Sequence, residues 1–203
     1  MKITDNVYAV EASKGSYVYA LRLSDGITLI DTSFPGRGGS IADELAANRL
    51  DQVKRILLTH HDVDHIGNAA FLQQKYQCDV YISKTDLPYV QGKKKREGVK
   101  RIISSLIRVK TPEIQPLPVN IIMNIRIIPT PGHTPGHTCF LFDGVLFAGD
   151  LVNSKRGVLQ KPPAPMTWNM RQAIDSAKAM NNMKFNWVCP AHGQPVKTGR
   201  IDI

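Results

Sequence analysis

The stretch LLTHHDVDHIGN, residues 57–68, decides how the rest of the chain is interpreted. An apolar run over 53–58 stops at five ionisable residues within six positions, and a second apolar pattern begins at Ile66. Charged and imidazole groups at a strand end must be solvated, paired or bound to metal, because burying them alone is costly. Histidines beside aspartates on one loop therefore predict a divalent metal centre. The five residues are His60, His61, Asp62, Asp64 and His65.

The remaining histidines repeat this placement. The chain has six histidines, and each follows the end of a predicted strand, while Asp150 ends a further strand. A lone histidine is more often structural, but such a distribution of all six indicates a site presented at a sheet edge. Outside the opening stretch the residues are His133 and His137 after 126–129, Asp150 after 145–148, and His192 after 186–189.

Length and composition indicate one compact domain. With 203 residues, 42% hydrophobic and 21% charged, the chain has the balance of an ordinary globular protein. No window approaches the roughly 18 apolar residues that span a bilayer, and the start has no apolar signal segment. The three cysteines form no C-x-x-C pair and predict reduced, mostly buried thiols in a cytoplasmic protein. They are Cys78, Cys139 and Cys189.

Hydrophobic periodicity predicts a strand-rich chain with a few helices. We expect an antiparallel β-meander first, then strands alternating with helices. The predicted strands cover 6–12, 16–23, 27–30, 55–58, 79–82, 121–123, 126–129, 139–142, 145–148 and 186–189. The predicted helices cover 40–46, started by Ser40, 68–76, and 170–177, started by Thr167.

The region 83–120 has the character of an insertion that carries most of the positive charge. Residues 93–110 contain eight Lys or Arg and one acid, a net +7 out of +9 for the chain. Their apolar residues recur at helical spacing, with Lys and Arg on the other face. Two interpretations stay open: a solvated surface helix, or a lid whose cations face an anionic substrate. The apolar stripe consists of Val99, Ile102, Ile103, Leu106 and Ile107.

On its motifs the chain resembles the metallo-β-lactamase-fold hydrolase superfamily. The motifs occur in the right order along the whole chain. The resemblance implies a single domain over 1–203, a four-layer αββα sandwich, with a dinuclear metal centre at one edge of the sheets. The matches are H-x-H-x-D-H at 60–65, T-P-G-H-T-x-G-H at 130–137, Gly149-Asp150, A-H-G-x-P at 191–195, and the aspartate of L-I-D-T at Asp31.

The resemblance also implies the ligands of two divalent ions, with one departure. Where the family most often has histidine, this chain has Asp62. Using His61 instead would break the alternation that brings 60 and 62 to one metal, so we expect Asp62 to bind and His61 to lie behind the ligands. The first ion would take His60, Asp62 and His133, the second Asp64, His65 and His192, and Asp150 would bridge them.

The extra carboxylate affects which metal the site is expected to bind. It makes the site harder than an all-imidazole one, which favours iron or manganese, although zinc remains the first expectation. The presence of Asp62 also raises the alternative that the first metal is absent. With two ions, a bridging hydroxide would attack the substrate. We expect Asp62, Asp64 and Asp150 to be the catalytic carboxylates, with the group that protonates the leaving atom open between Asp62 and Asp150. His137 and Asp31 are expected to have supporting roles.

The leading functional hypothesis is hydrolysis of a carboxylic ester, thioester or lactone. We expect the chain to lack the helical domain that follows the metal-binding domain in glyoxalase II enzymes, and the large inserted domain of the nucleic-acid-cleaving branch. A phosphodiesterase, phosphotriesterase or nuclease is the alternative, motivated by the cations of 93–110; an iron-dependent oxidoreductase of the persulfide-dioxygenase type is a further one. We expect a small-molecule substrate and no membrane partner. Nucleic acid is disfavoured because only Tyr89 offers stacking nearby, and a homodimer stays open.

Overall fold

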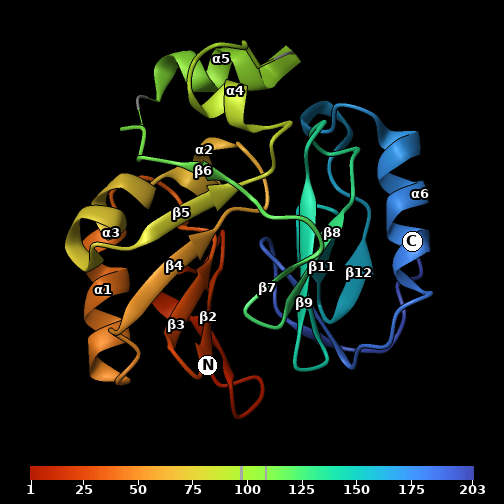
Figure 1. Ribbon diagram of the computed structural model, residues 1–203. Coiled ribbons are helices and arrows are strands. Elements are labelled where there is room, and N and C mark those ends of the chain that lie inside the picture. The colour runs from red at the N-terminus through yellow and green to blue at the C-terminus, as the bar shows by residue number, and fades with distance from the viewer. Residues whose placement is uncertain (97, 108) are drawn as a thin grey trace.

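Two six-stranded sheets lie face to face, with helices on both outer sides (Figure 1). The computed structural model describes residues 1–96, 98–107 and 109–203. The helices α1 and α3 cover the first sheet, and α6 covers the second. This arrangement confirms the predicted αββα sandwich.

The first sheet is built from the N-terminal half of the chain in sequence order. Its first three strands are antiparallel, as the predicted meander requires, and the following strands are parallel. The parallel crossovers are the helices α1 (Gly38–Ala47) and α3 (Ala69–Tyr76). The strands are β1 (Val7–Val10), β2 (Val18–Leu23), β3 (Gly26–Ile30), β4 (Val53–Leu57), β5 (Asp79–Ile82) and β6 (Gln115–Pro116).

The second sheet has the order β14-β13-β10-β9-β8-β7. Strands β10 and β13 are parallel, and the helix α6 (Met170–Met180) lies between them in sequence. A separate two-stranded ribbon pairs β11 (Asn153–Lys155) with β12 (Val158–Gln160). The sheet strands are β7 (Ile121–Ile122), β8 (Ile125–Pro129), β9 (Thr138–Phe142), β10 (Val145–Gly149), β13 (Trp187–Pro190) and β14 (Val196–Lys197).

Alternation along the strands creates three apolar layers, because successive side chains point to opposite faces of a sheet. On β2, Val18 and Ala20 join the layer under α1 and α3, whereas Tyr19 and Leu21 join the layer between the sheets. A third layer lies between the second sheet and α6. Burial of each large side chain contributes roughly 2–3 kcal/mol. The packed layers hold the strand ends rigidly, which positions the loops that follow them.

Two helix starts differ from the prediction, one because of a contact from a distant segment and the other because a different residue caps the helix. Helix α1 begins at Gly38 rather than Ser40, and the Gly38 N–H donates to Asn68 Oδ1 at 2.9 Å. Helix α6 begins after Asn169, whose side chain accepts from Gln172 N at 3.0 Å, whereas the Thr167 hydroxyl donates to a preceding carbonyl. Within the described ranges, no helix is long and apolar enough to cross a membrane.

The segment 83–120 supplies two helices and one strand. These are α4 (Leu87–Val90), α5 (Gly98–Leu106) and β6, which extends the first sheet beside β5. Helices α4 and α5 lie over the top of the sandwich, above α2 (Val63–Ile66) (Figure 1). Glu97 and Arg108, which enter the charge count of this segment, lie outside the described residues.

Helix α5 forms where the amphipathic stripe predicts it, but the side chain of one of its cations faces the protein. The apolar Val99, Ile102 and Leu106 are 43%, 62% and 78% exposed, whereas Ile103 lines the cavity beside Asp62 and Asp64. Lys100 is only 8% exposed. Of the two interpretations left open, a solvated basic face does not hold for Lys100, because Lys100 has a buried carboxylate to pair with. A lid whose cations face an anionic substrate stays a prediction.

The cysteines are free thiols buried in the apolar layers, as predicted. Burial raises the pKa of Cys78 to about 11 and that of Cys139 to about 12. These thiols stay protonated near neutral pH and act as small apolar side chains.

Candidate metal centre

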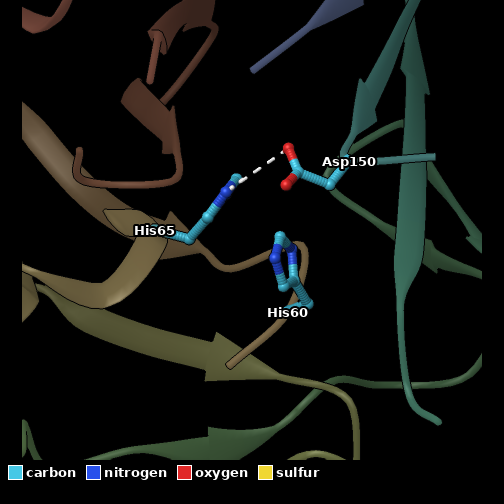
Figure 2. Close-up of side chains that lie close together, drawn as sticks. All are labelled: His60, His65 and Asp150. Atoms are coloured by element: carbon cyan, nitrogen blue, oxygen red, sulfur yellow. Dashed lines mark ion pairs between the residues drawn. The ribbon is translucent and has the colours of Figure 1, made fainter. Parts of the chain in front are cut away.

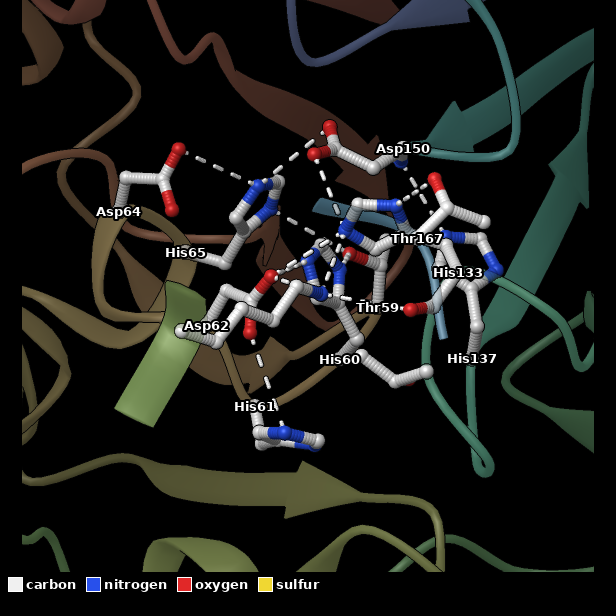
Figure 3. A network of polar contacts seen from close by, with 12 residues as sticks. Thr59, His60, His61, Asp62, Asp64, His65, His133, His137, Asp150 and Thr167 are labelled. Atoms are coloured by element: carbon white, nitrogen blue, oxygen red, sulfur yellow. Dashed lines mark hydrogen bonds and ion pairs between the residues drawn. The ribbon is translucent and has the colours of Figure 1, made fainter. Parts of the chain in front are cut away.

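Four strand ends bring all seven predicted ligand residues together at one edge of the sandwich. The loop and short helix after β4 carry four of them, and β8, β10 and β13 are followed by one each. Figure 3 shows most of these side chains pointing toward a common centre. Their donor atoms form three overlapping groups, each with atoms within 4.8 Å of one another: His60, Asp62 and His133; Asp64, His65 and His192; and His60, His65 and Asp150.

Asp150 lies between the first two groups, which we call the Asp62 half (His60, Asp62, His133) and the Asp64 half (Asp64, His65, His192). Its Oδ2 is 3.4 Å from His133 Nε2, and its Oδ1 is 3.4 Å from His192 Nε2. Oδ1 is also 3.5 Å from His65 Nε2, and Figure 2 shows this contact beside His60. One carboxylate thus contacts both halves, the place predicted for the bridging residue.

The Asp62 half is almost fully buried and contains a cation of the protein itself. Asp62 Oδ2 lies 3.3 Å from His60 Nε2 and 3.1 Å from His133 Nε2. The same oxygen is 2.5 Å from Lys100 Nζ. Burial alone would raise the pKa of Asp62, but the neighbouring His133 and His60 side chains and the charge of Lys100 hold that pKa well below its ordinary value.

The Asp64 half is more open. His192 Nε2 lies 3.1 Å from Asp64 Oδ2, and the two side chains are 28% and 17% exposed. His192 Nδ1 contacts the carbonyl oxygen of Gly15 at 2.5 Å, which directs Nε2 at the centre. Burial opposes the charge on His192, but Asp150 and Asp64 outweigh it and raise its pKa to about 10.

Asp31 orients His65, as expected for a supporting residue. Its Oδ2 is 2.9 Å from His65 Nδ1, while Thr59 donates to its carboxylate from both N and Oγ1 at 2.8 Å. A proton on Nδ1 shared with Asp31 leaves the Nε2 lone pair toward the centre. Asp31 adopts φ 60°, a left-handed conformation that is uncommon for a residue with a side chain.

His137 makes structural hydrogen bonds behind Asp150. The Asp150 backbone N–H donates to His137 Nε2 at 3.2 Å, and His137 Nδ1 is 2.9 Å from Thr130 Oγ1. Burial lowers the pKa of His137 to about 3, so the ring is neutral and accepts this hydrogen bond. Gly149 has φ +49°, and a Cβ there would lie 2.8 Å from His137 Nε2. A glycine is required for this close approach.

His61 lies at the border of the centre, with its Nε2 3.8 Å from Asp62 Oδ1 (Figure 3). Its Nδ1 is 2.8 Å from Asp86 Oδ2, and its ring stacks on Tyr89 with centroids 4.3 Å apart and planes 5° apart. Burial opposes ionisation of Asp86, but His61, Thr134 and the Gly136 N–H outweigh it and lower its pKa. His61 belongs to none of the donor groups found among the described residues. It joins the metal loop to α4 instead.

Lys100 is the residue of the centre that the sequence did not reveal as such, because it was counted with the basic face of its helix. A signal existed: Lys100 precedes Ile103 by three residues, so both lie on one side of α5 at the edge of the apolar stripe. Arg96 has a similar inward position, since its Nη2 donates to the carbonyl oxygen of His61.

The donor atoms fit a metal ion. Several buried nitrogens and oxygens have no hydrogen-bond partner among the described residues, which is costly unless something else binds them. Imidazole nitrogen with carboxylate oxygen is the usual ligand set for zinc, iron and manganese. The two groups bridged by Asp150 are consistent with a dinuclear metal site. The atoms without partners are His60 Nε2, His65 Nε2, Asp62 Oδ1 and Asp150 Oδ1.

Two cavities adjoin the centre. One, of about 330 Å³, borders Asp64 and His192 of the Asp64 half and also Asp62, and has mostly apolar walls. The other, of about 200 Å³, lies on the His133 side and is lined by Tyr89, Trp168 and Arg96 among others. Arg96, Lys100 and Met166 border both cavities. The apolar residues around the larger cavity are Phe34, Val63, Ile103, Ile107, Pro163 and Met166.

Known proteins are similar to this chain in sequence and in fold. The probable metallo-hydrolase YflN of Bacillus subtilis is 29% identical in an alignment of 233 positions that covers 94% of this chain and 88% of YflN. The hydroxyacylglutathione hydrolase of Shewanella halifaxensis is 31% identical over 138 residues, or 68% of this chain and 47% of that enzyme. The crystal structure of TTHA1623 in a di-iron-bound form superposes with a TM-score of 0.71 at 24% identity, covering 89% of both chains.

The match to a known family extends over most of the chain. Residues 14–192 match the family described as the metallo-beta-lactamase superfamily, a range that includes all seven ligand candidates. The chain belongs to the metallo-β-lactamase superfamily.

Proposed function

We propose that this protein is a metal-dependent hydrolase that cleaves a carboxylic ester, thioester or lactone. The observation that carries the proposal is the position of the unpartnered donor atoms beside a cavity with apolar walls. A divalent ion held there supplies Lewis acidity and lowers the pKa of a water nucleophile. The hydroxyacylglutathione hydrolase relative, whose name denotes a thioester substrate, supports the same reaction class.

The cavity favours an acyl group over a polyanion. Phe34, Ile103 and Met166 offer apolar surface to a hydrocarbon chain beside Asp64 and Asp150. By contrast, the exposed Lys93, Lys94 and Lys95 line neither cavity beside the centre. A nucleic-acid backbone bound to these lysines would not be brought to the donor groups by the cavities.

Arg96 is the residue that supports an anionic substrate. It borders both cavities, and its buried Nε has no hydrogen-bond partner among the described residues. Desolvation lowers the pKa of Arg96 while Asp62 and Asp86 oppose the change, so the side chain stays charged. A carboxylate or carbonyl oxygen of the substrate would satisfy this Nε. Asp62, Asp64 and Asp150 are the carboxylates proposed to act at the reacting bond.

The test is a substrate panel with protein loaded with zinc, manganese or iron. We expect hydrolysis of a carboxylic ester, a thioester or a lactone, loss of activity with a chelator, and recovery when the metal is restored. Arg96→Met should raise KM about 10-fold for a carboxylate-bearing substrate and much less for its neutral analogue. The exposed Lys95→Met is the matched control.

Two results would replace the proposal with another reaction class. The first is robust phosphodiester cleavage with little hydrolysis of any carboxyl compound. The second is oxygen consumption with a persulfide by the iron-loaded protein, in the absence of ester hydrolysis.

A further inference from the structure

The ammonium group of Lys100 lies inside the Asp62 half. Its Nζ is 2.5 Å from Asp62 Oδ2, 3.0 Å from His133 Nε2 and 3.3 Å from the His133 carbonyl oxygen. An ammonium group has three N–H donors, and these three acceptors match them. His133 Nε2 is also an atom that an ion in this half would need, and Asp62 Oδ2 is one of the two oxygens that Asp62 could offer to it.

Lys100 is buried, which is unusual for a lysine on a surface helix. A buried charge is costly unless it is paired and hydrogen-bonded, and Asp62 supplies the paired charge. An ordinary surface helix buries its apolar face and exposes its cations. Here Lys100 is 8% exposed whereas Val99 and Ile102 are 43% and 62% exposed. The contact with Asp62 explains why Lys100 is buried beside Ile103 on the side of α5 that faces the cavity.

The tautomer of His133 is compatible with the contact. His133 Nδ1 lies 3.5 Å from Thr167 Oγ1, so a proton on Nδ1 has an acceptor nearby. The Nε2 lone pair is then free to accept from Lys100. The same lone pair could bind a metal ion, so the ammonium and an ion compete for one atom.

The Lys100 ammonium group opposes a metal ion in the Asp62 half by charge. It offsets the negative charge of Asp62, from which it lies 2.5 Å. A divalent ion bound to Asp62 and His133 would lie close to this ammonium group, and two like charges in a buried site repel each other strongly.

We propose that the ammonium group of Lys100 takes the place of a metal ion in the Asp62 half. The protein then binds one divalent ion tightly, in the Asp64 half with Asp150. A second ion binds only after the ammonium group is withdrawn. This inference rests on the proposed metal centre and narrows its expected two ions to one. It assigns Asp62 to a pair with Lys100 in the resting protein.

The test counts ions without substrate. Metal-free wild type, Lys100→Met and the control Lys95→Met are dialysed against Zn²⁺ or Mn²⁺, and bound metal is measured by elemental analysis. We expect one tight ion per chain in wild type and in Lys95→Met, and two in Lys100→Met. Any second ion in wild type should bind at least about 100-fold more weakly. The manganese form of Lys100→Met should give the paramagnetic resonance spectrum of a coupled pair.

Wild type alone can overturn the proposal: two ions of comparable affinity per chain would do so, even if Lys100→Met failed to fold. A folded Lys100→Met, checked by circular dichroism, that still binds one ion also overturns it, as does a tight ion retained by His192→Ala. Hydrolysis is scored separately. A protein that binds one tight ion but has no esterase, thioesterase or lactonase activity contradicts the proposed function and supports this inference. A protein that binds two tight ions and has such activity supports the proposed function and contradicts this inference.

Discussion

The two halves of the centre contain the same donors, two histidines and one aspartate each, but they are stabilised differently. The Asp62 half is closed, and its carboxylate pairs with Lys100 from α5. The Asp64 half is partly open, and its histidines are oriented by Asp31 and by the Gly15 carbonyl oxygen. Lys100 pairs with the carboxylate of the first, whereas we propose that the second is filled by a bound ion. Donor count alone therefore does not determine how a site is filled.

The largest effect is expected where the halves meet. Asp150→Ala should remove metal from the protein and lower the hydrolysis rate by more than about 100-fold, because Asp150 contacts both halves and outer partners alone are worth about 10- to 100-fold. Elemental analysis and steady-state kinetics measure both. The exposed Asp175→Ala on α6 is the control. An Asp150→Ala protein with full metal content would exclude the bridging assignment.

A paired comparison should then separate the halves. His192→Ala should weaken binding of the tight ion about 100-fold, and Asp62→Ala less than about 10-fold, since the ion is expected beside Asp64. Competition with a chromophoric chelator gives both affinities. Equal losses in the two variants would show that the halves are equivalent.

The third effect concerns stability of the metal-free protein. Asp62→Ala leaves Lys100 without its carboxylate, and we expect the free energy of unfolding to fall by about 3 kcal/mol. Urea denaturation measures it, and Asp62→Ala combined with Lys100→Met should recover part of the loss. No recovery in the double variant would mean that the pair does not account for the loss.

A smaller effect is expected behind the Asp64 half. Asp31→Asn weakens the hold on His65 Nδ1, so the affinity for the ion should fall about 10-fold with little change in fold. The matched control is Asp25→Asn in the turn between β2 and β3, whose carboxylate pairs with Arg55 at the surface. The chelator competition applies here as well, and an unchanged affinity would remove Asp31 from the orienting role.

The smallest effect on metal is expected from His61→Ala. His61 contacts Asp86 and Tyr89, so its loss should cost about 1 kcal/mol of stability while metal affinity stays within about twofold of wild type. Thermal unfolding and metal titration test the two parts. A large fall in affinity would make His61, rather than Asp62, the ligand.

Much of this centre could be predicted because its signals are local. A run of apolar residues ending in His60, Asp62, Asp64 and His65 identifies a strand end with a metal loop, whatever packs around it. The layered fold follows from alternation in strands such as β2, where neighbouring residues face different cores. The assignment of Asp62 over His61 as a ligand stays a prediction, although the structure turns His61 toward Asp86.

Contacts between distant segments could not be predicted. Ser40 was expected to start α1, but Asn68 reaches that helix from the metal loop and caps Gly38. Helical periodicity identified the apolar stripe of α5 and could not say which side faces the protein. That choice depends on the pairing of Lys100 with Asp62, 38 positions away in the chain.

The amino-acid sequence by itself thus predicted most of the strands and helices and the metal loop, because each depends on neighbours in the chain, while the resemblance to a known family implied the seven donor residues. Only the tertiary structure decided the partners of those donors: Lys100 beside Asp62, Asp31 and Gly15 behind the Asp64 half, and the apolar cavity against them. The reason is physical. The cost of a buried charge depends on the groups that folding brings within a few ångströms of it, and sequence spacing does not encode them.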